Sequence, residues 1–459
     1  MNIITEVVQK GWCVGCGMCA AVCPKERLEI RWNPRGEYSP IEVEGCADCS
    51  KNCQICYKVC PAHGNTPDET EIGKKLYGKA EGVQYKSETG YYLSSYVGYS
   101  KEHRATGASG GMASWTLEAL LASGKVEAVA TVGRTKDPDK LFEFRICHSV
   151  EEIRASGRSA YYPVEVSQVM QYILNNEGRY AVIGLPCVCK AIRLAQDIFP
   201  KLKRRIPYVL GLTCGHQCSK FFAEYICALG GGDPHELREM IFRTKDLTQP
   251  ASNLGFLFHS GCGSNEIFKQ VLWRDGVGEA FANGFFQIPG CFYCDDVFAE
   301  CADIAFMDAW LPEYKKQPEG HSIILIRNTE ADELIGNEAC GSGKLKLSEI
   351  SIKRVMQSQL NVINQKQSLL FDKKDSLSLR YYLYKKPMIL QSRIRRIHFE
   401  ISDKSSIAWN FHKKNLVEFN KDNDLLELST KLSKYKKYQK IIRLPMRISG
   451  RIQRACLRI

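Results

Sequence analysis

The sequence lacks any apolar run long enough to cross a bilayer. No stretch of its 459 residues approaches the roughly 18 consecutive apolar residues of a spanning helix. The N-terminus reads MNIITEVVQKGWC and lacks the basic start and apolar core of a secretory signal. The sequence also offers no Ser–His–Asp or paired-carboxylate arrangement for hydrolytic chemistry, and no motif that reads a nucleic-acid groove. We therefore expect a cytoplasmic protein that does not bind nucleic acid.

Excess positive charge is confined to the last fifth of the chain. Residues 372–459 hold 22 of the 63 lysines and arginines but only 8 of the 51 aspartates and glutamates, so the rest of the chain carries a net charge of −2. The length suggests two or three domains, and this break in composition marks one boundary. We expect a cysteine-rich domain over residues 1–75, a body over 86–350 and a basic extension over 372–459.

Cysteine is abundant, with 21 residues. A reducing cytoplasm argues against disulfide bonds. Many of the cysteines are separated by only two or three residues, which is typical of metal ligands. The cysteines therefore indicate metal binding.

Two cysteine runs in the first sixty residues have the spacing of a ferredoxin that binds two [4Fe–4S] clusters. The run from Cys13 to Pro24 is C-x2-C-x2-C-x3-C-P, and the run from Cys46 to Pro61 is C-x2-C-x3-C-x2-C-x3-C-P. The short gaps let one tight loop hold three corners of a cluster, whereas the cysteine before proline ligates the other cluster. One predicted cluster is held by Cys13, Cys16, Cys19 and Cys60, and the other by Cys23, Cys49, Cys53 and Cys56.

The second run departs from the standard pattern at one position. A ligand normally stands where this chain has Ser50, so Cys49 is the nearer replacement and Cys46 is its rival. Zinc is the alternative metal, because CxxC pairs also bind zinc. Proline after the last cysteine and the interlocking of two runs favour iron–sulfur clusters.

The chain after residue 86 alternates between helical and strand-like patterns. Apolar residues at helical spacing predict helices over residues 110–122, 164–174 and 221–229. Short β-branched or buried runs predict strands over residues 126–132, 180–183, 208–212, 240–243, 255–259 and 322–327. We therefore expect an α/β body between the ferredoxin-like domain and a basic, mainly helical C-terminal tail.

Several short motifs of the body occur in the order known from one family. They are Thr106-Gly-Ala-Ser109-Gly110-Gly111, Gly184-Leu-Pro-Cys187, Gly211-Leu-Thr-Cys214, and Cys291-Phe-Tyr-Cys294-Asp followed by Ala302-Asp303 and Asp308-Ala-Trp310. In this order they resemble the coenzyme F420 (deazaflavin) hydrogenase/dehydrogenase beta-subunit family, which includes flavin-dependent reductases of chlorophyll precursors. The resemblance covers about residues 1–330 and implies an oxidoreductase with FAD and an additional [4Fe–4S] cluster in the body.

The resemblance implies that Cys187, Cys214, Cys291 and Cys294 hold the additional cluster. Cys187 and Cys214 each follow a predicted strand, and open α/β sheets bind ligands at the carboxyl ends of their strands. Burial of these two as small apolar side chains is the alternative. The other cysteines of the chain are substitute ligands (Cys189, Cys218 and Cys301) or structural residues (Cys147, Cys227, Cys262, Cys340 and Cys456).

The resemblance also implies two flavin-binding segments. The first contains Thr106, Ser109, Gly110 and Gly111, whose small side chains precede a predicted helix and would let backbone N–H groups approach a phosphate. The second contains Arg158, Ser159 and Tyr161. Ala160 stands where the family usually has lysine, so Arg158 is the basic group that could replace it. This departure casts doubt on use of the deazaflavin itself.

The end of the tail has basic residues at intervals of three and four, from Lys434 to Arg458, with aliphatic side chains between them. A helix with this pattern is basic and amphipathic, so it could lie peripherally on an anionic membrane. A solvated helix, or a helix face docked on the body or on a partner subunit, is the alternative.

A flavin and iron–sulfur clusters in one chain would link single-electron transfer to two-electron chemistry. We expect an oxidoreductase that passes electrons between the ferredoxin-type clusters, the additional cluster and FAD. Its partner would be ferredoxin or another redox protein, and its substrate an organic molecule or the deazaflavin. The alternative is an electron-transfer subunit that has no substrate site and feeds a partner enzyme.

Overall fold

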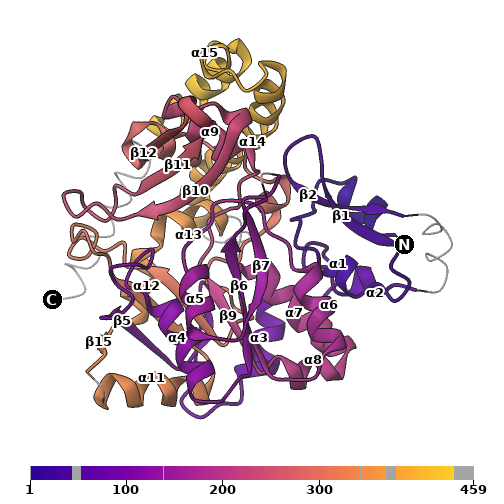
Figure 1. The fold of residues 1–459 in the computed structure, drawn as a ribbon, viewed down its shortest axis with the longest axis vertical. Helices are drawn as coiled ribbons and strands as arrows, with labels where there is room; N and C mark the ends of the chain where they lie inside the picture. Colours follow the sequence, from indigo (N-terminus) through magenta and orange to yellow (C-terminus); the bar gives the residue numbers. More distant parts are fainter. Residues whose placement is uncertain (1, 44–52, 138, 342, 368–378, 439–459) are drawn as a thin grey trace.

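A computed structural model describes residues 2–43, 53–137, 139–341, 343–367 and 379–438, with the backbone alone for residues 339–341 and 379–392. Its centre is a mixed sheet of eight strands in the order β15-β5-β14-β13-β9-β8-β6-β7 (Figure 1). The strands are β5 (Ser94–Ser100), β6 (Ala128–Arg134), β7 (Phe142–Cys147), β8 (Tyr180–Gly184), β9 (Tyr208–Leu212), β13 (Ile304–Asp308), β14 (Ser322–Ile326) and β15 (Leu345–Glu349). Strands β13, β9, β8 and β6 run parallel, whereas the strands outside them pair antiparallel. The carboxyl ends of the four parallel strands therefore meet at one edge of the sheet.

Helices cover both faces of this sheet because successive strand residues point to opposite faces. Val129 of β6 packs on the face covered by α4 (Met112–Ala122), α5 (Val150–Ser156) and α11 (Thr329–Gly341). Its neighbour Ala130 packs on the face covered by α6 (Ser167–Asn175), α7 (Pro186–Ile198) and α8 (Pro200–Arg205). The predicted α/β body is confirmed, and its predicted helices and strands are found with bounds that shift by at most three residues.

A second sheet of three antiparallel strands follows α9 (Phe221–Leu229) in the chain (Figure 1). Its strands are β10 (Leu237–Thr244), β11 (Gly255–Ser260) and β12 (Ile267–Leu272), and α10 (Val277–Ala282) follows them. These elements share a core rich in aromatic side chains, which includes Phe222, Phe242, Phe256 and Phe258. Short 3-10 helices connect them, namely η3 (Pro234–Glu236), η4 (Gly263–Asn265) and η5 (Trp273–Asp275), and η6 (Pro289–Tyr293) follows α10.

The cysteine-rich N-terminal segment packs on the body. Its helices are η1 (Ile4–Val8), α1 (Met18–Ala21), α2 (Ile55–Lys58) and α3 (Glu69–Tyr77). Between α1 and α2 lies the hairpin of β1 (Leu28–Trp32) and β2 (Tyr38–Glu42). After the segment comes the hairpin of β3 (Gln84–Lys86) and β4 (Gly90–Tyr92). Met18 and Val59 belong to the same apolar core as Met170 of α6. The Val166 N–H donates to the carbonyl oxygen of Cys16 (2.9 Å). The cysteine loop is therefore held directly against α6.

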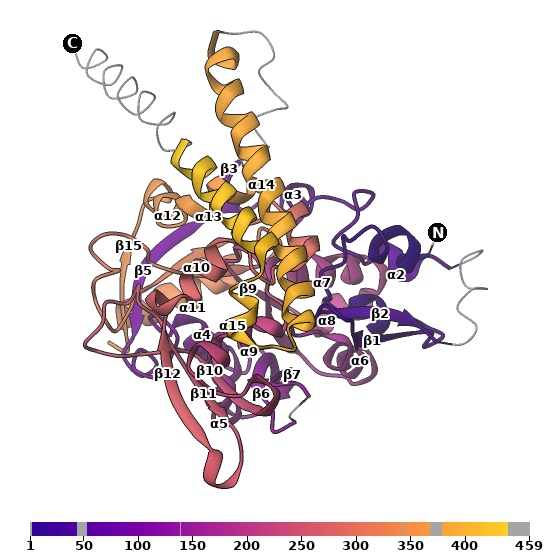
Figure 2. The same cartoon turned by 90° about the horizontal axis from the view of Figure 1, so that it is seen from above.

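The C-terminal tail is helical where it is described. It contains α14 (Leu379–Phe411), α15 (Leu416–Phe419) and a helix over residues 423–438. The first and last of these lie side by side (Figure 2) and share a small core around Ile401 and Leu432. The Trp409 indole N–H donates to the carboxylate of Glu224 in α9 (3.0 Å). The described helices of the tail are therefore docked on the body, whereas most of the basic segment for which membrane contact is predicted lies outside the described residues.

The tail also reaches the N-terminal segment. Asp403 of α14 pairs with Arg35 in the β1–β2 hairpin, and the Asn410 side chain donates to the carbonyl of Pro34 (2.7 Å). The arginines from Arg443 to Arg458, on which the predicted membrane contact depends, lie outside the described residues. Among the described helices, none has both the length and the hydropathy of a bilayer-spanning segment.

Candidate functional site

The first cysteine run folds into a tight loop. Gly15 and Gly17 adopt left-handed backbone conformations (φ 68° and 83°) that residues with side chains rarely adopt, so the chain turns twice within this run. Helix α1 begins after Gly17 and contains Cys19. The Gly15 N–H donates to the sulfur of Cys13 (3.4 Å), the kind of contact that would tune this sulfur if it held a cluster.

Cys60 follows α2 and joins this loop. Burial raises the pKa of Cys13 to about 11 and the pKa of Cys60 to about 12. After burial, the charge of Cys60 is the largest cause of the raised pKa of Cys16. Thiols that are buried and close together lose their protons when they bind a metal, because the metal takes the place of the protons. The structure therefore brings together Cys13, Cys16, Cys19 and Cys60, which are predicted to hold one cluster.

The second predicted cluster is described in part. Burial raises the pKa of Cys56, and the charges of Cys23 and Cys53 raise it further, so these three thiols lie near one another. The Arg27 N–H donates to the sulfur of Cys23 (3.3 Å). Cys46 and Cys49, the rival fourth ligands, lie outside the described residues.

Four body cysteines form a third group. Cys187 lies in the first turn of α7, directly after β8, and Cys214 follows β9, so both lie at the carboxyl edge of the sheet. Cys291 belongs to η6 and Cys294 ends it. Burial raises the pKa of Cys187, and the charges of Cys16 and of the other three body thiols raise it further. The predicted ligands of the additional cluster thus lie together, with Cys16 as a neighbour.

The spacing of these thiols bears on the choice of metal. Tetrahedral zinc with Zn–S bonds of about 2.3 Å holds its sulfurs about 3.8 Å apart. Within the described part of the chain, no set of three or more cysteines has all its sulfurs within 4.8 Å of one another. Within the described residues, the thiols of the two fully described quartets therefore do not form a compact tetrahedral site of zinc dimensions in this structure.

The other body cysteines differ in their surroundings. The thiol of Cys189 donates to the carbonyl of Leu210 (3.5 Å) and Cys301 is fully buried, so both serve the core. Cys218 lies near Cys291 and Cys214 and remains a substitute ligand. Cys147 and Cys227 are buried, as expected of structural residues, whereas Cys262 is exposed. The Cys340 side chain and Cys456 lie outside the described residues.

Sequence reasoning missed Lys366, which lies beside the body cysteines. It ends α13 (Leu360–Lys366), which follows α12 (Ile352–Ser358), and its side chain is buried. The ammonium donates to the sulfur of Cys294 (3.1 Å). Burial alone would lower the pKa of Lys366, but the charges of Cys294 and Cys214 raise it above its ordinary value. No motif in a single sequence marks this residue.

A large cavity opens at the carboxyl edge of the sheet. Its volume is about 810 Å³, within the range of cofactor and substrate sites. The ends of β8, β9 and β13 contribute to its mostly apolar wall, and so does the segment over residues 357–362. Cys16, Cys187 and Cys214 all line it. Cys218 lines it as well, so one thiol of the N-terminal loop shares a cavity with three thiols of the body.

Most of the predicted flavin contacts also line this cavity. They are Ser109, Gly111, Arg158, Ser159 and Tyr161. Thr106 is exposed and is not part of the cavity wall. Gly110 is packed against the backbone of Gly98 and Ser322, where a side chain would not fit, so this glycine serves close packing.

The cavity wall offers polar groups that suit an anionic cofactor. Gly111, Met112 and Ala113 place the N-terminus of α4 at the cavity, and helix N-termini bind phosphate. Burial lowers the pKa of Arg158, and nearby Arg134 lowers it further. No carboxylate among the described residues pairs with Arg158, so its charge is available to a ligand.

Three further polar side chains in the wall have buried atoms without a partner in the described structure. They are the Thr213 hydroxyl, both ring nitrogens of His216 and Nε of Arg243. The His216 ring stacks on Phe281, with a centroid distance of 4.0 Å. Burial lowers the pKa of His216 to about 3, so its ring is neutral at pH 7. Buried polar atoms are nearly always hydrogen-bonded, so these atoms indicate a ligand with polar groups of its own.

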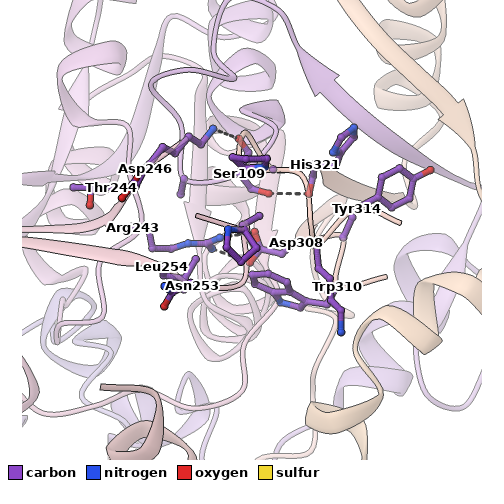
Figure 3. A pocket seen from close by; sticks show the side chains of 18 residues that line it. Ser109, Arg243, Thr244, Asp246, Asn253, Leu254, Asp308, Trp310, Tyr314 and His321 are labelled. Carbon is purple, nitrogen blue, oxygen red and sulfur yellow. Dashed lines mark hydrogen bonds and ion pairs between the residues drawn. The ribbon is translucent and has the colours of Figure 1, made fainter. Parts of the chain in front are cut away.

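A small pocket adjoins the cavity (Figure 3). Arg243 of β10 and Asp308 at the end of β13 face each other there and form two hydrogen bonds of 2.8 and 2.7 Å. The Ser109 hydroxyl donates to the carbonyl of His321 (2.8 Å). Lys245 donates to the carbonyl of Ser109 (2.7 Å). These contacts fix the loop before α4.

Glu102, His103 and Glu118 have ligand atoms close enough to hold a metal ion. Arg154 already occupies this cluster, because its guanidinium donates to both carboxylate oxygens of Glu118 (2.9 and 2.8 Å). The cluster is therefore an ion-pair network that braces α4 and the loop before it.

Comparison with known proteins places the chain in a family. A model described as coenzyme F420 hydrogenase/dehydrogenase, beta subunit N-term, matches residues 95–171, and its C-terminus counterpart matches residues 177–353. The chain belongs to this family. The expected resemblance is thereby confirmed, and both matches end before Lys366.

Several members and neighbours of the family are similar to the chain. The coenzyme F420-dependent sulfite reductase of Methanocaldococcus jannaschii is 23% identical over 347 residues, which is 72% of this chain and 46% of that protein. One of the subunits of the F420H2 dehydrogenase of Methanosarcina mazei is 27% identical over 218 residues, which is 46% of this chain and 55% of that protein. The chain thus spans about half the length of these two relatives.

Two further matches are of a different kind. An uncharacterized ferredoxin of Methanocaldococcus jannaschii is 37% identical over 57 residues, which is 12% of this chain and 69% of the ferredoxin. A chain of the F420-reducing [NiFe] hydrogenase complex of Methanosarcina barkeri matches with a TM-score of 0.47 and 16% identity, over 65% of this chain and 99% of that chain.

Proposed function

We propose that this protein is an iron–sulfur flavoprotein oxidoreductase. Two ferredoxin-type [4Fe–4S] clusters in residues 1–75 exchange single electrons with a third cluster in the body, held by Cys187, Cys214, Cys291 and Cys294. FAD in the large cavity supplies the two-electron chemistry on an organic substrate or a deazaflavin. The observation that carries this proposal is that Cys16, Cys187 and most of the predicted flavin contacts line one cavity.

Contacts around the cysteine loop support electron transfer between the N-terminal segment and the body. The backbone hydrogen bond from Val166 to Cys16 fixes the loop on one side. On the other side Trp12 stacks edge-on with Tyr293, which lies between the body ligands Cys291 and Cys294 (centroid distance 6.0 Å). Redox centres held by such contacts keep a constant separation, which is the task of the protein in cofactor chemistry.

The cavity wall supports FAD as the second kind of cofactor. Arg158 and the N-terminus of α4 would hold the pyrophosphate, because both offer positive charge and N–H donors. His216 and Thr213 would hydrogen-bond polar atoms of the ring system or of the substrate. The apolar remainder of the wall would exclude water from the reacting atoms.

An electron-transfer subunit without a substrate site is the second candidate. It is favoured by the chain's likeness to one of the subunits of a dehydrogenase and by its spanning only about half of that relative. The partner would be a separate redox enzyme or a ferredoxin. Turnover of a candidate substrate by the isolated chain with a soluble reductant supports the first function, and reduction of a partner protein without such turnover supports the second.

The test of the cofactor set is anaerobic purification with iron, sulfide and flavin measured together. We expect about twelve iron atoms and one FAD per chain, from three four-iron clusters. C16S and C187S should each lose about four iron atoms, whereas C262S, a change at an exposed cysteine, should lose none. A colourless, zinc-loaded protein would contradict the iron–sulfur proposal. A protein that is loaded with iron but does not retain added FAD would contradict the proposal that FAD is a cofactor.

A further inference from the structure

Lys366 is a buried cation that no part of the proposed function explains. Its side chain is 5% exposed and its ammonium has three acceptors: the sulfur of Cys294 (3.1 Å), the carbonyl of Asp296 (2.7 Å) and the carbonyl of Cys214 (3.3 Å). Its three N–H groups are thus all directed at two body cysteines and the loop that follows them.

The ammonium has no carboxylate as its direct partner. Within the described residues, no carboxylate oxygen of an aspartate or glutamate lies within 4.0 Å of the Lys366 nitrogen, whose aspartate contact is to the backbone carbonyl of Asp296. The Asp296 carboxylate instead accepts from the Glu300 N–H (3.1 Å). A buried charge is costly unless it is paired, and a neutral thiol is only a weak acceptor. The charge of the Asp296 carboxylate acts on Lys366 from beyond contact distance, whereas a metal-bound thiolate at Cys294 would place negative charge in direct contact with the ammonium.

Lys366 also belongs to a part of the chain that the family match does not include. The match ends at residue 353, and α13 brings Lys366 back to the body cysteines. Arg395 of α14 lines the same small cavity as Lys366 and Cys291, so a second cation approaches this group from the tail. The C-terminal segment therefore adds positive charge to a site whose ligands all come from the family body.

We propose that Lys366 is a positioning residue that raises the reduction potential of the body cluster through Cys294. The proposal rests on the proposed function, because it assumes a cluster at these four cysteines. In the step concerned, an N-terminal ferredoxin-type cluster is oxidised by one electron and the body cluster is reduced by that electron, with no proton transferred. The added negative charge is stabilised by the adjacent ammonium, and hydrogen bonds to cluster sulfurs act in the same direction. Electrons would thus be drawn from the N-terminal clusters toward the cavity.

The test is an EPR-monitored titration of the full chain with dithionite, combined with iron determination. The variants are K366M, which removes charge and donors, K366Q, which keeps an N–H donor, and K366R, which keeps the charge. K353M, a change at an exposed lysine of α12, is the matched control. We expect K366M and K366Q to shift the body-cluster midpoint to more negative potential, K366R and K353M to leave it near that of the unmodified chain, and the N-terminal clusters to stay unchanged in all four.

Each outcome decides the proposal. An unshifted midpoint in either neutral variant overturns it. Loss of about four iron atoms in both neutral variants, with retention in K366R, supports a requirement for the positive charge. Loss in K366R as well shows that the shape of the side chain matters and overturns the proposal. The proposed function fails separately, if the unmodified chain lacks the EPR signal and the four iron atoms that C187S should remove.

Discussion

Arg243 and Asp308 join the two sheets of the body at the wall of the large cavity. Arg243 lies in β10 of the three-stranded sheet, Asp308 ends β13 of the central sheet, and both guanidinium Nη atoms donate to the carboxylate. Only 8% of the Arg243 side chain and 17% of the Asp308 side chain are exposed. The pair therefore connects the two sheets by a buried ion pair at the cavity wall.

Breaking this ion pair should destabilise the protein. R243M leaves a buried carboxylate without its partner, which typically costs about 3–5 kcal/mol of unfolding free energy. R243M/D308L replaces both partners by apolar side chains and should recover much of this loss. The measurement is the urea midpoint of the iron-loaded chain under anaerobic conditions. Equal midpoints for R243M and the unmodified chain would show that the pair contributes nothing.

Replacement of Cys46 and Cys49 should settle which of them is the fourth ligand of the second N-terminal cluster. Because Cys49 stands one residue from the usual ligand position, C49S should lose about four of the twelve iron atoms and C46S should lose none. Iron and sulfide determination after anaerobic purification is the measurement. The reverse pattern would assign Cys46 instead.

Arg158 should contribute to flavin affinity. A charge-assisted hydrogen bond is worth about 1.5–3 kcal/mol, so R158Q should weaken FAD binding by about 10-fold or more. Flavin fluorescence on titration of the flavin-depleted chain measures the dissociation constant. R179Q, which removes an arginine paired with Glu127 at the amino end of β8, is the control and should bind FAD normally. Equal affinities for the two variants would exclude Arg158 from the flavin site.

Stability should fall in mild acid because of buried histidines. Burial lowers the pKa of His398 to about 3, whereas an unfolded histidine titrates near about 6.5. Below this pH the unfolded chain binds a proton that the native state excludes, so unfolding free energy is lost at up to about 1.4 kcal/mol per pH unit for this residue. His216 acts in the same sense.

In H398L the unfolding free energy should therefore fall less steeply between pH 6.5 and pH 5 than in the unmodified chain. The positive charge of Lys436 and the ring of His216 are the titratable neighbours that lower the pKa of His398 further. I397L, a change at a buried residue of the same helix that does not titrate, is the control and should keep the unmodified slope. Parallel plots of unfolding free energy against pH for H398L and the unmodified chain would show that His398 does not cause the loss of stability in acid.

Truncation after Tyr438 isolates the predicted membrane contact. It removes residues 439–459 with their five arginines, which at about 1 kcal/mol each should weaken binding to anionic vesicles at least about 100-fold. The docked helices remain, so iron content and thermal stability should be retained. Co-sedimentation with anionic and with neutral vesicles is the measurement. Equal sedimentation of the full and truncated chains would remove membrane contact as a role of these residues.

Much of the body could be predicted from local patterns. Val182 and Ile183 belong to a short apolar run that indicates a buried strand, and glycine and cysteine follow it at the edge where parallel sheets bind ligands. The cysteine runs indicated two groups of thiols because their spacing reflects the reach of a single loop. Such signals are local, so one sequence is enough to show them.

The residues that the sequence analysis did not identify contact partners that are far away along the chain. Lys366 reaches Cys294 across 72 residues, and Arg243 meets Asp308 across 65. Neither belongs to a motif, and α14 lacks a clear apolar stripe along its length, so its docking on α9 leaves no local pattern. His216 stands two residues after Cys214, and this proximity was the one available hint.

The contact of Arg35 with Asp403 sets a condition on biosynthesis. The two residues are 368 positions apart, so at about 5–20 residues per second the ribosome needs roughly 20–70 s between them. During this time the N-terminal cysteines have been synthesised, but α14, which later contacts the β1–β2 hairpin, has not. Iron delivery during this interval would meet an N-terminal segment whose β1–β2 hairpin is not yet held by α14, whereas delivery after release would meet the complete set of contacts.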